Sequence, residues 1–237
     1  MSVKNGRIKQ SVSFWNFNIA GECWDAEKTC QIAKQLGCLS VEVIDTPEWP
    51  TLKKHGLICA MSLNGIEGPP FVKGFNNPRY LEELTACTKQ AIDDSAAAGF
   101  PNVLAFTGYR WRDAEDPTSG EISLEEGADN CVAGLKDLAA YAASKNVTLC
   151  LEQLNTRDDS HPMKGHPGYQ GEDIDYVASI VQRVDSPGLK LLFDIYHVQI
   201  MNGDVIRRFR EHRDFISQIN TAGNPGRAEL DETQEIN

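Results

Sequence analysis

The sequence predicts an α/β protein of the (β/α)₈ TIM-barrel class, and three observations lead to this prediction. Short apolar runs typical of strands alternate with longer segments of helical period, which is the pattern of a parallel sheet built from βα units. The length of 237 residues is close to the roughly 250 residues of a typical barrel. Glycines precede several of the expected strands, as left-handed residues at helix ends do; they are Gly37, Gly56, Gly99 and Gly188.

Strands and helices are expected in alternation along the chain. Apolar runs place seven strands at residues 8–14, 39–44, 57–61, 102–106, 147–152, 190–194 and 215–220. Amphipathic spacing places helices at Ala26–Leu36, Tyr80–Ala98, Leu124–Ser144, Ile174–Val184 and Gly203–His212, with a short helix at 47–54. Seven units are one short of a full barrel, so we expect residues 1–237 to form a single domain that lacks its last helix–strand unit.

An open, doubly wound parallel sheet is the alternative architecture. Such a sheet should carry a glycine-rich phosphate-binding turn after an early strand. Neither G-x-G-x-x-G nor G-x-x-x-x-G-K occurs in the sequence. The barrel is therefore the preferred prediction.

The net charge, the apolar runs and the cysteines of the chain limit the kinds of partner that it can bind. The chain has 23 Lys and Arg against 34 Asp and Glu, a net charge of −11, which repels nucleic-acid phosphates and anionic lipid. No run of about 18 apolar residues could span a bilayer, and the seven cysteines form no C-x-x-C pair, as suits the reducing cytoplasm. We expect a cytoplasmic protein that binds a small molecule, not nucleic acid or membrane, and a homo-oligomer is compatible with this.

Polar residues close three of the expected strands. In a barrel, functional groups project from the carboxyl ends of the strands, which here carry Glu152, Asp194, and the pair Gln218 and Asn220. A carboxylate after an apolar strand is costly to bury unless it is paired or binds a metal. Two such acids on adjacent strands favour a shared cation, and oxygen-rich ligands suit Mg²⁺ or Mn²⁺. Gln218 and Asn220 point to the same side of their strand, so the pattern leaves open which one faces the metal.

Further residues near these strand ends are candidates for catalysis or substrate binding. His197 lies three residues past Asp194, in an expected loop, and can face a substrate. Arg227, in a turn-rich loop, can bind a carboxylate or sugar oxygens. We also assign Asn155, which follows the fifth strand, and Trp15, at the end of the first strand, to the substrate side. Taken singly, each of these residues could instead be a helix cap, a core residue or a solvated side chain.

One acidic residue lies inside a strand and not at its end. Glu42 is part of the second strand, within the run Val-Glu-Val-Ile. If its side chain points inward near the top of the barrel it reaches the site, and if it points outward it meets the helix dipoles. The sequence leaves both orientations open.

Three segments carry a resemblance to a known family. They are Glu152-Gln-Leu-Asn-Thr-Arg-Asp158, Phe-Asp194-Ile-Tyr-His197-Val-Gln, and the stretch from Asn220 through Asn-Pro-Gly-Arg227 to Asn237. Together they resemble hydroxypyruvate isomerase-like proteins of the xylose isomerase-like TIM-barrel superfamily, and the likeness extends over nearly the whole chain from Ser11.

The resemblance implies a metal site and contacts to the substrate. It implies a divalent metal held by Glu152, Asp194, a His or Gln of the seventh strand and a Glu of the eighth strand, with His197 and Arg227 contacting the substrate. The sequence departs from this pattern twice. The seventh-strand position is Asn220, a shorter side chain, and no eighth strand is expected in the chain.

The activity implied by the resemblance is a metal-dependent isomerisation in carbohydrate metabolism. Metal-bound carbonyl and hydroxyl oxygens of hydroxypyruvate, or of a similar small 2-hydroxycarbonyl compound, would stabilise an enediolate while Glu152 moves the proton. The nearest alternative is a ketose 3-epimerase of the same superfamily. A barrel that binds a sugar-like ligand without catalysis is a third reading, which Asn220 keeps open. Endonucleases of abasic DNA in the superfamily need several His ligands and a basic face, which the charge of −11 opposes.

Overall fold

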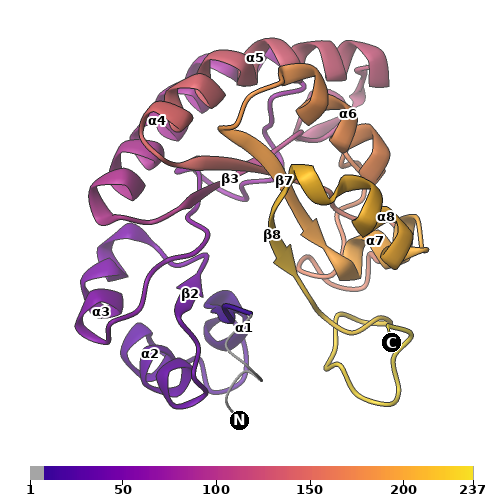
Figure 1. The fold of residues 1–237 in the computed structure, drawn as a ribbon. Helices are drawn as coiled ribbons and strands as arrows, with labels where there is room; N and C mark the ends of the chain where they lie inside the picture. The colour runs from indigo at the N-terminus through magenta and orange to yellow at the C-terminus, as the bar shows by residue number, and fades with distance from the viewer. Residues whose placement is uncertain (1–7, 237) are drawn as a thin grey trace.

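The parallel strands pair in the order in which they occur along the chain. The computed structural model describes residues 8–236, and its strands curve into an open barrel with the helices outside them (Figure 1). The predicted α/β TIM-barrel class is confirmed. The parallel strands are β1 (Ser11–Ser13), β2 (Ser40–Glu42), β3 (Asn102–Phe106), β6 (Thr148–Glu152), β7 (Leu189–Asp194) and β8 (Ile216–Asn220).

The strand predicted at 57–61 is present as an irregular segment between β2 and β3. Isolated parallel bridges join Ile58 to Ser40 of β2, and Ser62, one residue past the predicted run, to Val103 of β3. The N–H groups of Val41 in β2 and of Val43, one residue past its end, donate to the carbonyls of Ile58 and Met61, three residues apart on this segment. This offset interrupts the regular ladder, as a β-bulge does.

The helices connect these strands and cover their outer side. The helices predicted from periodicity are confirmed to within two residues at each end. No helix among residues 8–236 is long and apolar enough to cross a membrane. The α-helices are α1 (Trp15–Asn18), α2 (Ala26–Gln35), α3 (Trp49–Lys54), α4 (Leu81–Ala98), α5 (Leu124–Ser144), α6 (Ile174–Val184), α7 (Ile195–Met201) and α8 (Val205–His212). Short 3₁₀ turns lie at Thr46–Glu48, Pro78–Tyr80 and Arg213–Phe215, and an antiparallel hairpin consists of β4 (Trp111–Asp113) and β5 (Asp116–Glu121).

The prediction that His197 lies in a loop is wrong, because α7 begins directly after β7 and includes His197. Asp194 ends the strand, and its side chain accepts the N–H of Tyr196 and so caps the helix. Since no turn residues separate the two elements, strand and helix share one apolar stretch. Periodicity alone therefore does not divide them.

Alternation along the strands decides which side chains enter the barrel. On β6, Leu149 and Leu151 pack outward in the main core between strands and helices, whereas Cys150 belongs to the cluster inside the barrel. Glu152 is two residues from Cys150 and so lies on the same inner side. The same alternation on β7 places Asp194 inside.

A side-chain contact joins the two ends of the strand series inside the barrel. Among the described residues, no strand pairs with the outer edges of β1 and β8. Gln218 of β8 donates through Nε2 to Oε2 of Glu42 on β2 at 2.8 Å, and the hydroxyl of Ser11 donates to Oε1 of the same carboxylate. Glu42, whose direction the sequence left open, therefore points into the barrel.

Candidate metal centre and active site

Glu152 and Asp194 end the neighbouring strands β6 and β7 and meet inside the barrel. With His197 they form a buried cluster in which one ligand atom of each residue lies within 4.8 Å of the others. Parallel strands end at the same edge of a sheet, so two acids at adjacent strand ends are brought together by pairing alone. The structure thus unites three of the residues that the sequence singled out.

Glu152 has an acidity suited to proton transfer. Burial raises the pKa of its carboxyl group to about 8, and the negative charge of Asp194 adds to this rise. The charge of Arg227 lowers the pKa, and the charge of Glu42 makes a smaller contribution that raises it. A carboxyl group with a pKa near neutrality can both accept a proton and return it.

Asp194 uses both of its oxygens within the protein. Oδ1 accepts the backbone N–H of Tyr196 at 2.9 Å, and Oδ2 accepts Nη2 of Arg227 at 3.0 Å. Nε2 of His197 lies 3.6 Å from the same Oδ2, which is too far for a hydrogen bond. A cation bound at Oδ2 would therefore share this oxygen with Arg227.

Arg227 is held by aromatic rings as well as by Asp194. Its guanidinium carbon lies 5.0 Å from the ring centre of Trp15 and 5.3 Å from that of Tyr196, and Nη1 donates to the carbonyl of Met163 at 2.6 Å. The structure therefore places Trp15, which begins α1, beside the arginine. Tyr196 is a site residue that the sequence analysis missed, although it lies within the motif that carries Asp194 and His197.

Asn155 and His197 are in direct contact and have no exposed surface. The backbone N–H of Asn155 donates to Nδ1 of His197 at 3.1 Å, and the side-chain Nδ2 lies 2.7 Å from the same nitrogen. Burial, followed by the charge of Arg227, lowers the pKa of His197 well below its usual value. The folded protein therefore favours the neutral form of this imidazole.

The structure separates Gln218 from Asn220, which the sequence could not do. Both lie on the less exposed side of β8. Gln218 pairs in register with Leu192 and its amide is bound to Glu42, whereas Asn220 pairs with Asp194 itself. Asn220 is therefore the residue of β8 at the level of the acid cluster.

His166 lies next to the site, on the segment between β6 and α6. Its ring packs 4.0 Å from the ring of Phe71 and 6.0 Å from that of His197, measured between centres, and its backbone N–H donates to the carbonyl of Asn155. His166 is not among the residues that the sequence analysis selected for the site. The segment has no apolar periodicity that could have located it.

The charges of the site fit a divalent cation. Three buried carboxyl groups, those of Glu42, Glu152 and Asp194, lie close enough to interact with one another, and the guanidinium of Arg227 forms an ion pair with Asp194. Carboxylate and amide oxygens are the ligands that Mg²⁺ and Mn²⁺ accept. The residues present therefore suit such an ion better than they suit a structural zinc, which takes Cys or several His.

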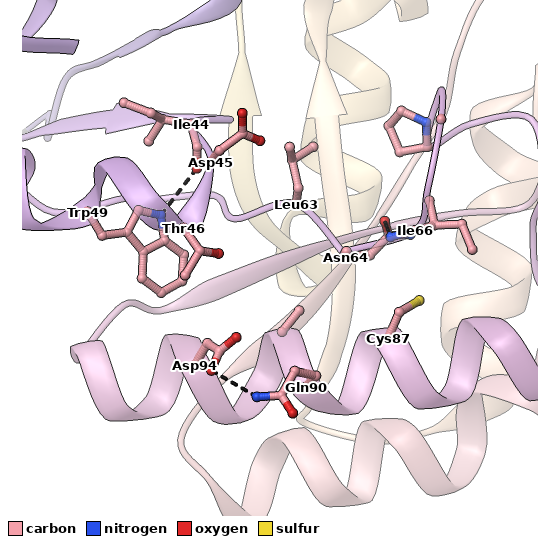
Figure 2. A pocket seen from close by; sticks show the side chains of 14 residues that line it. Ile44, Asp45, Thr46, Trp49, Leu63, Asn64, Ile66, Cys87, Gln90 and Asp94 are labelled. Atoms are coloured by element: carbon pink, nitrogen blue, oxygen red, sulfur yellow. Dashed lines mark hydrogen bonds between the residues drawn. The ribbon is translucent and has the colours of Figure 1, made fainter.

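A separate cavity of about 340 Å³ lies outside this cluster. Figure 2 shows side chains from three segments around it: the residues after β2, the loop at 63–70, and α4. Its polar lining includes Asp45, Asn64 and Asp94, but no member of the acid cluster. The buried, mutually interacting acids lie at the strand ends, away from this cavity.

The fold is a TIM barrel in which two buried acids, Glu152 and Asp194, lie together at adjacent strand ends. A sequence model described as "Xylose isomerase-like TIM barrel" matches residues 30–233. The chain belongs to this family, as the sequence analysis predicted.

The chain is similar to two named isomerases over part of their length. It is 28% identical to the putative hydroxypyruvate isomerase of Homo sapiens over 149 residues, 63% of this chain and 50% of that protein. It is 32% identical to the 2-oxo-tetronate isomerase of Cupriavidus necator over 132 residues, 54% of this chain and 48% of that protein. The chain thus spans about half the length of these curated relatives.

Solved structures resemble the fold over most of the chain. An AP endonuclease, family 2, from Brucella melitensis matches with a TM-score of 0.74 and 21% identity, covering 97% of this chain and 85% of that one. D-psicose 3-epimerase from Clostridium cellulolyticum H10, solved with D-tagatose, matches with a TM-score of 0.71 and 14% identity, covering 94% and 77%. At these identities the likeness shows the fold alone.

Proposed function

We propose that this chain carries the active site of a metal-dependent isomerase that acts on hydroxypyruvate or a similar small 2-hydroxycarbonyl compound. The observation that carries the proposal is the buried cluster of Glu152, Asp194 and His197, whose ligand atoms lie within 4.8 Å of one another at the ends of two adjacent strands. The names of the human and C. necator relatives support the reaction class and the size of the substrate.

Glu152 is the proton carrier in this proposal. It takes a proton from the carbon that bears the hydroxyl group and returns it to the neighbouring carbon, while the hydroxyl proton passes to the former carbonyl oxygen. The product is the isomer in which carbonyl and hydroxyl have exchanged places. Because Glu152 is buried, its base strength is not weakened by hydration.

Arg227 selects for an anionic substrate in this proposal. Its planar guanidinium, which lies near the rings of Trp15 and Tyr196, matches the two oxygens of a carboxylate. Hydroxypyruvate has such a group, whereas a neutral ketose has none. This residue is the reason for preferring the isomerase over the 3-epimerase.

A divalent ion fits the same residues. Glu152, Asp194 and Asn220 would hold Mg²⁺ or Mn²⁺, and the ion would supply Lewis-acid polarisation of the substrate oxygens. Asn220 enters this set because it pairs with Asp194 in register. Its neutral amide oxygen is a weaker ligand than a carboxylate.

We propose a cytoplasmic location, which the cysteines support. All seven are free thiols in the structure. Burial raises the pKa of Cys150 to about 12 and also raises that of Cys131, so both are unreactive packing groups. Free, buried thiols of this kind are typical of proteins in a reducing compartment.

The proposal is tested by metal-dependent turnover. Chelator-treated protein is supplied with Mg²⁺ or Mn²⁺ and assayed with hydroxypyruvate and with D-tagatose, and Glu152→Gln is compared with Glu125→Gln, an exposed acid of α5. We expect conversion of hydroxypyruvate that needs the metal, survives Glu125→Gln and falls at least about 10³-fold in Glu152→Gln.

Each other result points to a different reading. Turnover of the ketose but not of hydroxypyruvate would replace the isomerase by the 3-epimerase. Binding of either compound without turnover would identify a barrel that binds its ligand without catalysis. Full activity in Glu152→Gln would remove the acid from the mechanism.

A further inference from the structure

The contact between Asn155 and His197 determines where the imidazole carries its proton. Asn155 follows β6, and His197 lies in the first turn of α7, so the pair links the ends of two adjacent strands. Both side chains are fully buried. Two nitrogens of Asn155, the backbone N at 3.1 Å and the side-chain Nδ2 at 2.7 Å, face Nδ1 of His197.

The orientation of the Asn155 amide is fixed by its other partners. Oδ1 accepts the backbone N–H of Asp158 at 3.0 Å, and Nδ2 donates to the carbonyl of Lys164 at 2.7 Å. Turning the amide by half a rotation would set oxygen against the carbonyl and NH₂ against the N–H, and both contacts would become repulsive. The atom that faces His197 is therefore an N–H donor, as the backbone N–H always is.

With two N–H donors directed at it, Nδ1 of His197 is an acceptor. A neutral imidazole has one acceptor nitrogen and one N–H, so the proton lies on Nε2. Nε2 is buried and has no hydrogen-bond partner among the described residues. Buried donors without an acceptor are uncommon in proteins, and this one lies beside Oδ2 of Asp194, at 3.6 Å, inside the acid cluster.

We propose that Asn155 is a positioning residue that fixes His197 as the Nε2–H tautomer. The contact of His197 with the substrate, which the family resemblance already implies, is then made by an N–H donor, and His197 does not bind the metal. Binding a metal through Nε2 would need a lone pair where the proton lies, and Nδ1 is blocked by two donors. The statement that His197 donates to a substrate oxygen rests on the proposed isomerase function. The tautomer itself does not.

This assignment divides the buried cluster by role. Glu152 and Asp194 offer oxygens to a cation, while His197, although within the same 4.8 Å group, offers a donor to the substrate. Asn155, which the sequence analysis placed on the substrate side, acts through His197 in this proposal. A donor directed at a substrate oxygen stabilises the negative charge that develops there during proton transfer.

The first test reads the tautomer directly. Long-range ¹H–¹⁵N correlation spectra of protein with ¹⁵N-labelled histidine distinguish an N–H nitrogen from an acceptor nitrogen, and the His197→Gln spectrum assigns the signals of His197. We expect the proton on Nε2 in the wild type and a shift of the proton to Nδ1 in Asn155→Asp, which places a carboxylate in contact with Nδ1. A wild-type proton on Nδ1 would overturn the proposal even if the isomerase is active.

The second test uses two amide replacements of His197. Glutamine places its NH₂ near the position of Nε2, whereas asparagine places it near Nδ1. We expect His197→Asn to lower kcat by roughly 10²-fold, the usual cost of one such donor, and His197→Gln to recover at least about tenfold of this loss with KM little changed. Equal losses in the two variants would argue against the donor role.

The third test counts bound Mn²⁺ by electron paramagnetic resonance. We expect wild type and His197→Asn to bind Mn²⁺ with affinities within about threefold of each other, and loss of binding in His197→Asn would make His197 a ligand and overturn the proposal. If the wild type shows the Nε2–H tautomer but neither binds Mn²⁺ nor turns over hydroxypyruvate, the proposed function fails and the tautomer assignment stands.

Discussion

The two sides of the candidate site are built differently. On the β6–β7 side, Asn155 and His197 are fully buried and share two contacts, and Asp194 is 1% exposed. On the β8 side, Gln218 and Asn220 are only half-buried. The reason lies in the sheet, because β6 and β7 pair on both edges whereas β8 pairs, among the described residues, with β7 alone. Groups that need a fixed geometry therefore lie between paired strands.

The largest effect is expected from a titratable group on the buried side. Burial, and then the charge of Arg227, lower the pKa of His166 to about 4 from the ordinary 6.5. The folded state thus favours the neutral ring. Its contribution to stability is complete above the unfolded pKa and is lost as the pH falls from about 6.5 towards 4. A shift of this size corresponds to roughly 3 kcal/mol over that interval.

Urea unfolding of the wild type and of His166→Leu at neutral and acidic pH measures this effect. The leucine variant has no ring to protonate, so its free energy of unfolding should fall less between neutral pH and about pH 4.5. Equal acid destabilisation of the two proteins would show that His166 is hydrated in the folded state. The β6–β7 side of the site would then be less tightly packed than its low exposure indicates.

On the β8 side, replacing Gln218 should mainly lower stability, whereas replacing Asn220 on the same strand should mainly weaken Mn²⁺ binding. Gln218→Leu removes the donor to Oε2 of the buried Glu42, and we expect a loss of about 2 kcal/mol in the free energy of unfolding. Asn220→Ala should cost less than about 1 kcal/mol and instead weaken Mn²⁺ binding roughly tenfold. Denaturation and Mn²⁺ titration of both variants measure the two quantities, and the opposite result would exchange their roles.

The smallest expected effect concerns Arg227, which connects the two sides. Its guanidinium occupies Oδ2 of Asp194, so Arg227→Met should free this oxygen and tighten Mn²⁺ binding about tenfold, or about 1.4 kcal/mol. Arg207→Met, which removes an exposed charge on α8, is the matched control and should leave Mn²⁺ affinity unchanged. Weaker Mn²⁺ binding in Arg227→Met would show that arginine and metal do not compete.

The sequence predictions are correct where the apolar residues of an element follow a clear period, and they fail where no such period exists. Apolar strands such as 147–152, and amphipathic helices such as 174–184, were located because burial on one or both faces leaves a pattern in the residue order. The hairpin β4–β5 left none, since the residues of β5, Asp116–Glu121, are polar and almost all exposed. The join between β7 and α7 was missed because both elements are apolar there.

The sequence by itself determined which residues stand at the strand ends, because alternation and chain order suffice to bring Glu152 and Asp194 to one edge of the barrel. Only the tertiary structure decided their partners. It brought Gln218 to Glu42, 176 residues away, and joined Asn155 to His197 and Arg227 to Asp194. Such contacts depend on strand register and on the path of a loop, which are fixed by the packing of the whole barrel and leave no periodic trace in the residues themselves.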